Sequence, residues 1–289
     1  MPYRKNGFTL IELLVVISII SLLSSIILAT LSPVRGRAQI AAGQTFADQT
    51  YHTFGADSAA TFDFDEGSGN TAYDTSGNGN NGTLMPGGVS GPLWTTDSIQ
   101  GTALVFNGTS NYVSLGNNNT SLSSISDVFT IGAWIKLSTI NNRMVIYTNG
   151  DINYGGDPTN SFTFDVSYGC GSLSEINGLE IILPGIYVGC TASNLLSANT
   201  WYYVAYTKNG PLERGIFYID GVAYPPIDYT GVSTSFASGN NHRFIGMRNN
   251  SSLYFNGSID ELHIYTDSLT SEQIKNIYFT ERTKYLAKN

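Results

Sequence analysis

Charged residues are scarce in this sequence of 289 residues. Asp, Glu, Lys and Arg together make up only 12% of it, about half the usual share. The shortage is greatest for basic residues beyond position 50, where 10 Lys and Arg stand against 20 Asp and Glu. An acidic domain of this kind repels the phosphate backbone, so we expect no nucleic acid among the partners of the chain.

Cysteine is almost absent, since the sequence has only Cys170 and Cys190. Their spacing fits no CxxC metal pattern, and no second pair exists to complete a zinc site. If this part of the chain is exported, we expect the two thiols to form one disulfide that closes a long loop. Two unrelated buried thiols remain the alternative.

Long amphipathic helices are missing beyond Ala59, which excludes repeated βαβ units. Apolar residues alternate there with period two, between turns rich in Gly, Asn, Ser and Asp. Many short strands joined by turns predict a mainly β fold, an antiparallel sandwich or jelly roll. The strands are predicted at Ala103–Asn107, Tyr112–Leu115, Phe129–Leu137, Arg143–Thr148, Phe162–Val166, Trp201–Lys208, Gly215–Ile219, Phe244–Met247 and Ser258–Tyr265.

One short helix is expected near the end of the chain. Thr270-Ser-Glu-Gln273 is a capping box, in which the side chains of Thr270 and Gln273 each accept a backbone N–H of the first turn. Ile274, Ile277 and Tyr278 then recur at helical spacing, which favours a helix with one apolar face.

The longest apolar run lies at the start of the chain. Phe8 to Leu31 holds 17 apolar residues among 24 and a single charge, Glu12. A helix of this length crosses a bilayer, and Arg4 and Lys5 ahead of it place the short leader in the cytoplasm and the rest outside. A cleavable secretory signal has a shorter apolar core, so we expect the anchor to be retained.

Glu12 indicates which kind of anchor this is, because a carboxylate inside an apolar helix needs a partner. The segment Lys5-Asn-Gly-Phe-Thr-Leu-Ile-Glu12 resembles the processing site of type IV prepilins and related pseudopilins. The resemblance implies that a prepilin peptidase cuts after Gly7 and that the new N-terminal residue, Phe8, is N-methylated. It also implies that Glu12 pairs with the N-terminal amine of a neighbouring subunit during assembly, so the partners are other pilin subunits and the pilus assembly machinery.

These signals divide the chain into four segments. Residues 1–7 are the predicted leader, 8–31 the transmembrane and filament-core helix, and 32–58 a helical extension and linker that begins near Pro33. Residues 59–289 form the predicted head. The chain is thus expected to be a single-pass protein of the cytoplasmic membrane with its head outside, and then part of an extracellular filament or the cell surface.

Several segments of the head resemble laminin-G-like, concanavalin A-like jelly rolls. They occur in the order of that family and span nearly all of residues 59–280. The resemblance implies a jelly-roll sandwich with a lectin-like role in adhesion or in binding carbohydrate or protein. The segments are Phe64–Gly69, Asp74–Leu84, Gly101–Gly108, Tyr112–Gly116, Phe129–Lys136, Trp201–Ala205, Phe217–Gly221 and Phe255–Tyr265.

Calcium is the cofactor that the acidic residues favour. Asp65 and Asp74 lie in Gly- and Asn-rich turns of the opening segment, and Asp260 lies in the closing one. Hard cations prefer carboxylate and amide oxygens, and a jelly roll brings its first and last strands together. The resemblance implies a structural calcium near the same place. The alternative is that Asp65 and Asp74 form turns by accepting local backbone amides.

Catalytic patterns are absent from the head. Hydrolases of this fold place carboxylates on one strand, as in E-x-D-x-x-E, and none of the eight glutamates begins that motif. The adjacent pairs Asp65-Glu66 and Asp260-Glu261 would face opposite sides of a strand. The sequence therefore predicts that the chain is not an enzyme. The three histidines stand in no triad context, and the last is expected to point off one face of the final strand; they are His52, His242 and His263.

A type IV pilin-like surface filament subunit with a lectin-like head is the function that these signals predict. A pseudopilin of a type II secretion or DNA-uptake machine is the alternative. A surface-tethered glycoside hydrolase is the third and weakest hypothesis.

Overall fold

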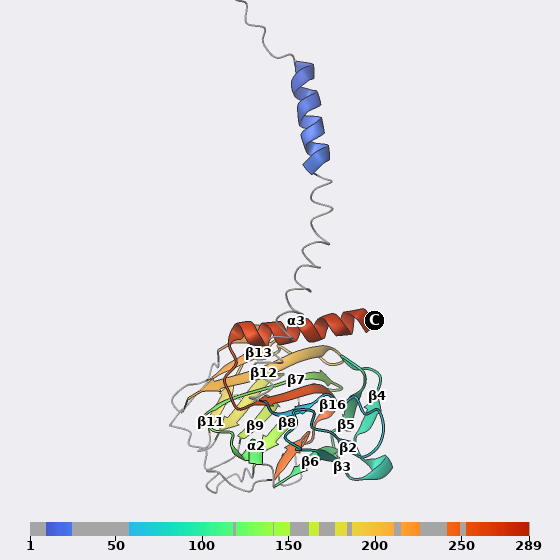
Figure 1. Ribbon diagram of the computed structural model, residues 1–289, viewed down its shortest axis with the longest axis vertical. Coiled ribbons are helices and arrows are strands. Elements are labelled where there is room, and N and C mark those ends of the chain that lie inside the picture. Colours follow the sequence, from blue (N-terminus) through green and yellow to red (C-terminus); the bar gives the residue numbers. More distant parts are fainter. Residues whose placement is uncertain are drawn as a thin grey trace, which may run out of the picture. The chain divides into compact units, whose positions relative to one another are not determined.

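The computed structural model describes residues 10–24, 58–117, 120–140, 142–150, 162–167, 177–183, 187–210, 215–225, 242–248 and 253–288. The chain divides into two units, Met1–Phe46 and Ala47–Asn289. The first unit contains the N-terminal helix, and the second contains all of the strands (Figure 1).

The N-terminal unit is described as one helix, α1, at residues 10–24. Its apolar side chains are exposed along its whole length, and the hydroxyls of Ser18 and Ser21 donate to the carbonyls of Leu14 and Ile17. The helix is shorter than the predicted segment 8–31, whose two ends lie outside the described residues. Among the described residues, no helix is both long and apolar enough to cross a membrane.

In its described residues, the second unit is a sandwich of two antiparallel sheets with eight strands each. The first sheet runs in the order β14-β13-β12-β7-β16-β5-β4, and β1 also pairs with β16. The second runs in the order β11-β10-β9-β8-β15-β6-β3-β2. The strands of the first sheet are β1 (Ser58–Phe62), β4 (Leu93–Thr95), β5 (Ala103–Asn107), β7 (Val128–Leu137), β12 (Trp201–Asn209), β13 (Ile216–Ile219), β14 (Val222–Tyr224) and β16 (Asn256–Tyr265). Those of the second sheet are β2 (Thr71–Ala72), β3 (Gly82–Met85), β6 (Tyr112–Gly116), β8 (Met144–Asn149), β9 (Phe162–Ser167), β10 (Gly178–Leu183), β11 (Tyr187–Cys190) and β15 (Arg243–Ile245).

The nine strands predicted from period-two alternation are all present, as β5, β6, β7, β8, β9, β12, β13, β15 and β16. The described strands that the sequence did not reveal include three very short ones, β2 with two residues and β4 and β14 with three. So few residues cannot display an alternating pattern, so only pairing with neighbours defines them. The mainly β, antiparallel sandwich is therefore confirmed.

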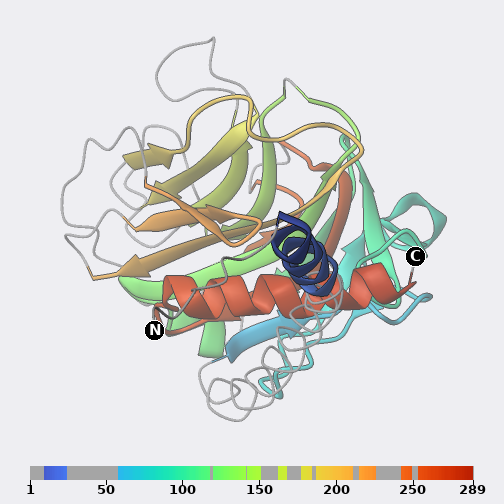
Figure 2. The same ribbon diagram turned by 90° about the horizontal axis from the view of Figure 1, so that it is seen from above.

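Two apolar layers hold this unit together. The larger lies between the sheets and includes Phe129 and Ile131 of β7 and Ile259 and Leu262 of β16. The smaller lies on the outer face of the first sheet, under helix α3 (Ser271–Lys288), and includes Trp134 and Tyr203. Figures 1 and 2 show α3 lying across the strands of this sheet.

Helix α3 begins at the predicted capping box. The Gln273 side-chain oxygen accepts the backbone N–H of Thr270 at 2.6 Å, and the Thr270 hydroxyl accepts that of Gln273 at 3.3 Å. At the other end, the Lys288 ammonium donates to the carbonyls of Thr96 and Gly101 and to the Ser98 hydroxyl. Both ends of the helix are thus held by polar contacts, and its middle packs on aromatic residues of the sheet.

Candidate functional site

The predicted processing residues lie at the edge of the described chain. Gly7 and Phe8 are outside the described residues, and Glu12 lies exposed in the first turn of α1. Cleavage after Gly7, methylation of Phe8 and pairing of Glu12 during assembly therefore stay predictions.

Asp74 organises the turn that follows β2. Its Oδ1 accepts the backbone N–H groups of Thr61 and Ser76 at 3.0 Å each, and its Oδ2 accepts that of Asn80 at 2.8 Å. Burial opposes the charge of this carboxyl, but the hydrogen bonds from Ser76, Thr61 and Asn80 lower its pKa below the ordinary value. These contacts match the turn-forming alternative that the sequence left open.

Asp65 and Asp260 converge on one loop, which joins β4 to β5. Asp65 Oδ1 accepts the backbone N–H of Thr102 at 3.0 Å, and Asp260 Oδ2 accepts that of Ile99 at 2.7 Å. The two carboxylates thus accept backbone N–H groups three residues apart in that loop. In the described part of the chain, Asp65, Asp74 and Asp260 do not form a three-ligand group around one point. Calcium at these residues stays a prediction.

The predicted disulfide is described at one end only. Cys190 ends β11 and is buried, whereas Cys170 lies outside the described residues. Pairing of the two sulfur atoms is therefore still a prediction.

Strand β16 departs from regular alternation at Asp260 and Glu261. Ile259 and Leu262 both belong to the core between the sheets, so two residues rather than one separate these core positions. The register against β7 shifts between Asp260 and His263, and Glu261 has a φ of +46°. This β-bulge turns both carboxylates away from the core. The prediction that Asp260 and Glu261 face opposite sides of a strand was wrong, because it assumed an uninterrupted pleat.

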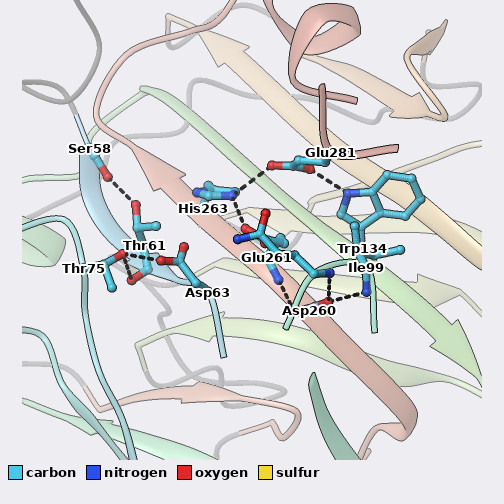
Figure 3. Close-up of polar contacts among 11 residues, drawn as sticks. Ser58, Thr61, Asp63, Thr75, Ile99, Trp134, Asp260, Glu261, His263 and Glu281 are labelled. Atoms are coloured by element: carbon cyan, nitrogen blue, oxygen red, sulfur yellow. Dashed lines mark hydrogen bonds and ion pairs between the residues drawn. The ribbon is translucent and has the colours of Figure 1, made fainter. Parts of the chain in front are cut away.

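The bulge brings Glu261 to a cluster of polar side chains on the outer face of the first sheet (Figure 3). His263 Nε2 lies 3.6 Å from Glu261 Oε2 and 3.2 Å from Glu281 Oε1 of helix α3. The indole N–H of Trp134, on β7, donates to Glu281 Oε2 at 2.6 Å. Strand β16 and helix α3, consecutive along the chain, therefore place two carboxylates beside one ring nitrogen, and Trp134 of the distant β7 holds one of them.

The cluster is deeply buried. The side chains of Glu261, His263 and Glu281 are 5%, 13% and 8% exposed. Burial raises the pKa of Glu261. Burial lowers the pKa of His263, but Tyr265, Glu261 and Glu281 outweigh it and raise that pKa well above its usual range. Burial and the charge of Glu261 likewise raise the pKa of Asp260.

Sequence reasoning missed this cluster, although one signal was present. The buried side chains of α3 are Ile274, Tyr278 and Glu281, so a glutamate takes the next place on the buried stripe that the two apolar residues define. A charge on the buried face of an amphipathic helix needs a partner on the surface that it covers. The partners of Glu281 depend on the bulge in β16, which the sequence does not reveal.

Two further carboxylates meet on the outer face of the second sheet. Asp165 of β9 and Glu180 of β10 are directly opposite each other in the antiparallel register. Both are buried, and the Arg143 guanidinium lies 2.9 Å from Asp165 Oδ2 and 2.7 Å from Glu180 Oε1. Burial raises the pKa of Asp165, despite the nearby Arg143 and Arg248. The sequence search considered carboxylates along a single strand, so it could not find a pair formed across two strands.

Comparison with protein families identifies both parts of the chain. The chain belongs to the concanavalin A-like lectin/glucanases superfamily, whose model matches residues 107–275. The prokaryotic N-terminal methylation motif matches residues 2–28. Together these matches define a type IV pilin-like precursor with a lectin-like β-sandwich, and they confirm the resemblance found in the sequence. The motif implies processing by a prepilin peptidase and use of the pilus assembly machinery. No curated protein matches this sequence.

Solved structures share the fold at low sequence identity. Domain 4 of an extracellular arabinanase from Geobacillus stearothermophilus, in complex with arabinotriose, matches with a TM-score of 0.53 and 19% identity over 77% of this chain and 98% of that one. Trypanosoma rangeli sialidase in complex with sialic acid matches with a TM-score of 0.54 and 12% identity. The match covers 78% of this chain but only 33% of the sialidase. The binding domain of botulinum neurotoxin serotype D matches with a TM-score of 0.53 and 16% identity. The match covers 80% of this chain and 52% of that one.

These structures correct the prediction that the chain is not an enzyme. The arabinanase and the sialidase are glycoside hydrolases, so chains with this fold occur in enzymes of that class. The missing one-strand motif was an insufficient reason for the exclusion, because carboxylates can also meet across strands, as Asp165 and Glu180 do. At these identities the likeness shows the fold alone.

Proposed function

We propose that this chain is a subunit of a type IV pilin-like surface filament whose β-sandwich head binds glycans outside the cell. The observation that carries the proposal is the union, in one chain, of the methylation motif at residues 2–28 with a concanavalin A-like sandwich. In this scheme residues 8–31 hold the precursor in the cytoplasmic membrane and later pack in the filament core.

Helix α1 supports the first half of the proposal. It exposes apolar side chains all round, from Leu10 at 78% to Leu23 at 53%. A helix that is apolar on every side needs an apolar environment, which a bilayer provides before assembly and neighbouring subunits provide after it. Glu12 is its single acidic residue, and a subunit's N-terminal ammonium is a partner of opposite charge.

Glycan binding by the head rests on the comparisons. Two of the structures with this fold are complexes with sugars, arabinotriose in the arabinanase domain and sialic acid in the sialidase. The arabinanase match spans nearly all of that domain, so the shared unit is the whole sandwich. Binding to a surface protein is the other outcome of the tests.

The filament role is tested by mass spectrometry of the intact chain from a sheared surface fraction of the native host. We expect a mature chain that begins at N-methylated Phe8, and an uncleaved precursor for Gly7→Ala. A wild-type chain that begins at Met1, or is cut near Thr30, contradicts prepilin processing and with it the filament role.

The glycan role is tested with the purified full chain in detergent, against arabino-oligosaccharides and sialylated oligosaccharides by calorimetry. We expect saturable binding of at least one of these sugars, and none by the same chain after thermal unfolding. If neither class binds while the chain still adheres to host-cell protein, the head is a protein-binding module and the glycan proposal fails.

A further inference from the structure

We propose that Glu261, His263 and Glu281 form a binding site for one divalent transition-metal ion of the zinc class, which joins helix α3 to strand β16. The proposal concerns the layer between helix α3 and the outer face of the first sheet, and it is independent of the filament role. It rests on the spacing of the ligand atoms, on two buried polar atoms without hydrogen bonds, and on the contact that orients Glu281.

The spacing of the three groups suits a small cation. One ligand atom from each of Glu261, His263 and Glu281 can be chosen so that all lie within 4.8 Å of one another, the single such group in the described residues. Ligands at ~2.0–2.1 Å from a tetrahedral zinc ion are about 3.3 Å apart. The separations from His263 Nε2, 3.2 Å to Glu281 Oε1 and 3.6 Å to Glu261 Oε2, lie on either side of that value.

Two atoms of the cluster are buried without a hydrogen bond. His263 Nε2 lies at ion-pair distance from both carboxylates, 3.2 Å from Glu281 Oε1 and 3.6 Å from Glu261 Oε2, without an aligned hydrogen bond to either. Glu261 Oε1 is likewise buried and unsatisfied, in a residue that is only 4% exposed. Buried polar atoms are normally satisfied, and each exception requires an explanation. A cation shared by the ring nitrogen and the carboxylates would satisfy both atoms at once.

The chemistry of the ligands selects the class of ion. An imidazole nitrogen suits zinc and its neighbours among the transition metals, whereas calcium prefers six to eight oxygen ligands. Two carboxylates also balance the charge of a divalent ion when the imidazole is neutral. Three protein ligands leave one tetrahedral position for water.

A contact outside the ligand set holds Glu281 in place. The Trp134 indole donates to Oε2 of Glu281 at 2.6 Å, which leaves Oε1 facing His263 (Figure 3). Trp134 is itself held by ring contacts with Tyr203 and Tyr278, at centroid distances of 5.7 and 5.6 Å. Orientation of a ligand by a hydrogen bond to its second oxygen is a common feature of metal sites.

The experiment uses the full chain in detergent, freed of metal with a chelator and then titrated with zinc against a chromophoric competitor. We expect one zinc ion per chain. Glu281→Gln and Glu261→Gln should each weaken binding by at least about tenfold. Glu272→Gln is the matched control, because Glu272 is an exposed glutamate in the first turn of the same helix. Its affinity should equal that of the wild type.

A second measurement needs no ligand variant. Zinc at about 100 times its dissociation constant should raise the Tm of the wild-type chain by about 5–10 °C, and calcium at the same concentration should raise it less. The proposal is overturned if the wild type binds no zinc, or if both ligand variants bind zinc as tightly as the wild type. It is also overturned if calcium stabilises the chain as much as zinc does.

Discussion

Single side chains hold the first turns of the sandwich in place. Asp74 accepts backbone N–H groups from the end of β1 and from two positions of its own turn. Thr61 is itself paired with His263 of β16, so the carboxylate ties the turn to a strand of the first sheet. Satisfied buried amides of this kind stabilise a fold mainly because their loss leaves donors without partners.

Asp74→Asn should therefore destabilise the sandwich by about 1–3 kcal/mol at pH 7, since the amide nitrogen would face N–H donors. The measurement is urea unfolding of the full chain in detergent, with a chelator present so that metal ions do not contribute.

The hydrogen bonds from Ser76, Thr61 and Asn80 lower the pKa of Asp74 against the effect of burial. Its contribution is thus complete above the ordinary value of 3.8 and is lost as the pH falls through the folded-state pKa. A difference between wild type and variant that is the same at pH 3 and pH 7 would contradict this assignment.

At the scale of elements, helix α3 and strand β16 depend on each other. The helix covers the outer face of the first sheet, and its buried Glu281 lies beside His263 of β16. The helix N-terminus is held by the capping box of Thr270 and Gln273. The box satisfies two backbone donors that otherwise have no partner in the first turn.

Thr270→Ala should lower the free energy of unfolding by about 1 kcal/mol, because the N-cap oxygen is lost. For a unit of this size that corresponds to a Tm lower by about 2–4 °C, measured by circular dichroism. Thr270→Ser keeps the oxygen and is the control, with a Tm close to that of the wild type. Equal Tm values for the alanine and serine variants would show that the cap contributes nothing.

At the scale of the molecule, the chain combines a helix that is apolar on every side with an acidic β-sandwich. The first suits a bilayer or a filament core, and the second suits aqueous surroundings. The proposed filament role accounts for both in one chain, since such a subunit would pass from the membrane to the surface. Glu12 is the residue at which this transition can be tested.

Glu12→Ala should leave membrane insertion unchanged and reduce the yield of sheared filaments by at least about tenfold. A buried ammonium left without its partner is destabilised by about 3–5 kcal/mol, which is ample for this effect. Ser18→Ala is the control in the same helix, because its hydroxyl donates to the carbonyl of Leu14 one turn earlier. Filaments of Glu12→Ala at wild-type yield would refute the assembly role.

The sequence by itself determined the class of the protein and much of its fold. Patterns that are local along the chain carried this information: the glycine ahead of the apolar run, alternation with period two in nine strands, and the capping box at Thr270. Such patterns reflect the chemistry of neighbouring residues, so they can be read without knowing what packs against them. For the same reason, the two-residue strand β2 could not be read.

Only the tertiary structure decided which polar side chains meet. Glu261, His263, Glu281 and Trp134 come from three elements, and a bulge of one extra residue turns Glu261 toward the other three. Asp165 and Glu180 meet across strands whose register is set by pairing in the sheet. A shift of one residue in either place would point these side chains to the opposite face. Register and bulges follow from packing of the whole sandwich, and so do the sites that depend on them.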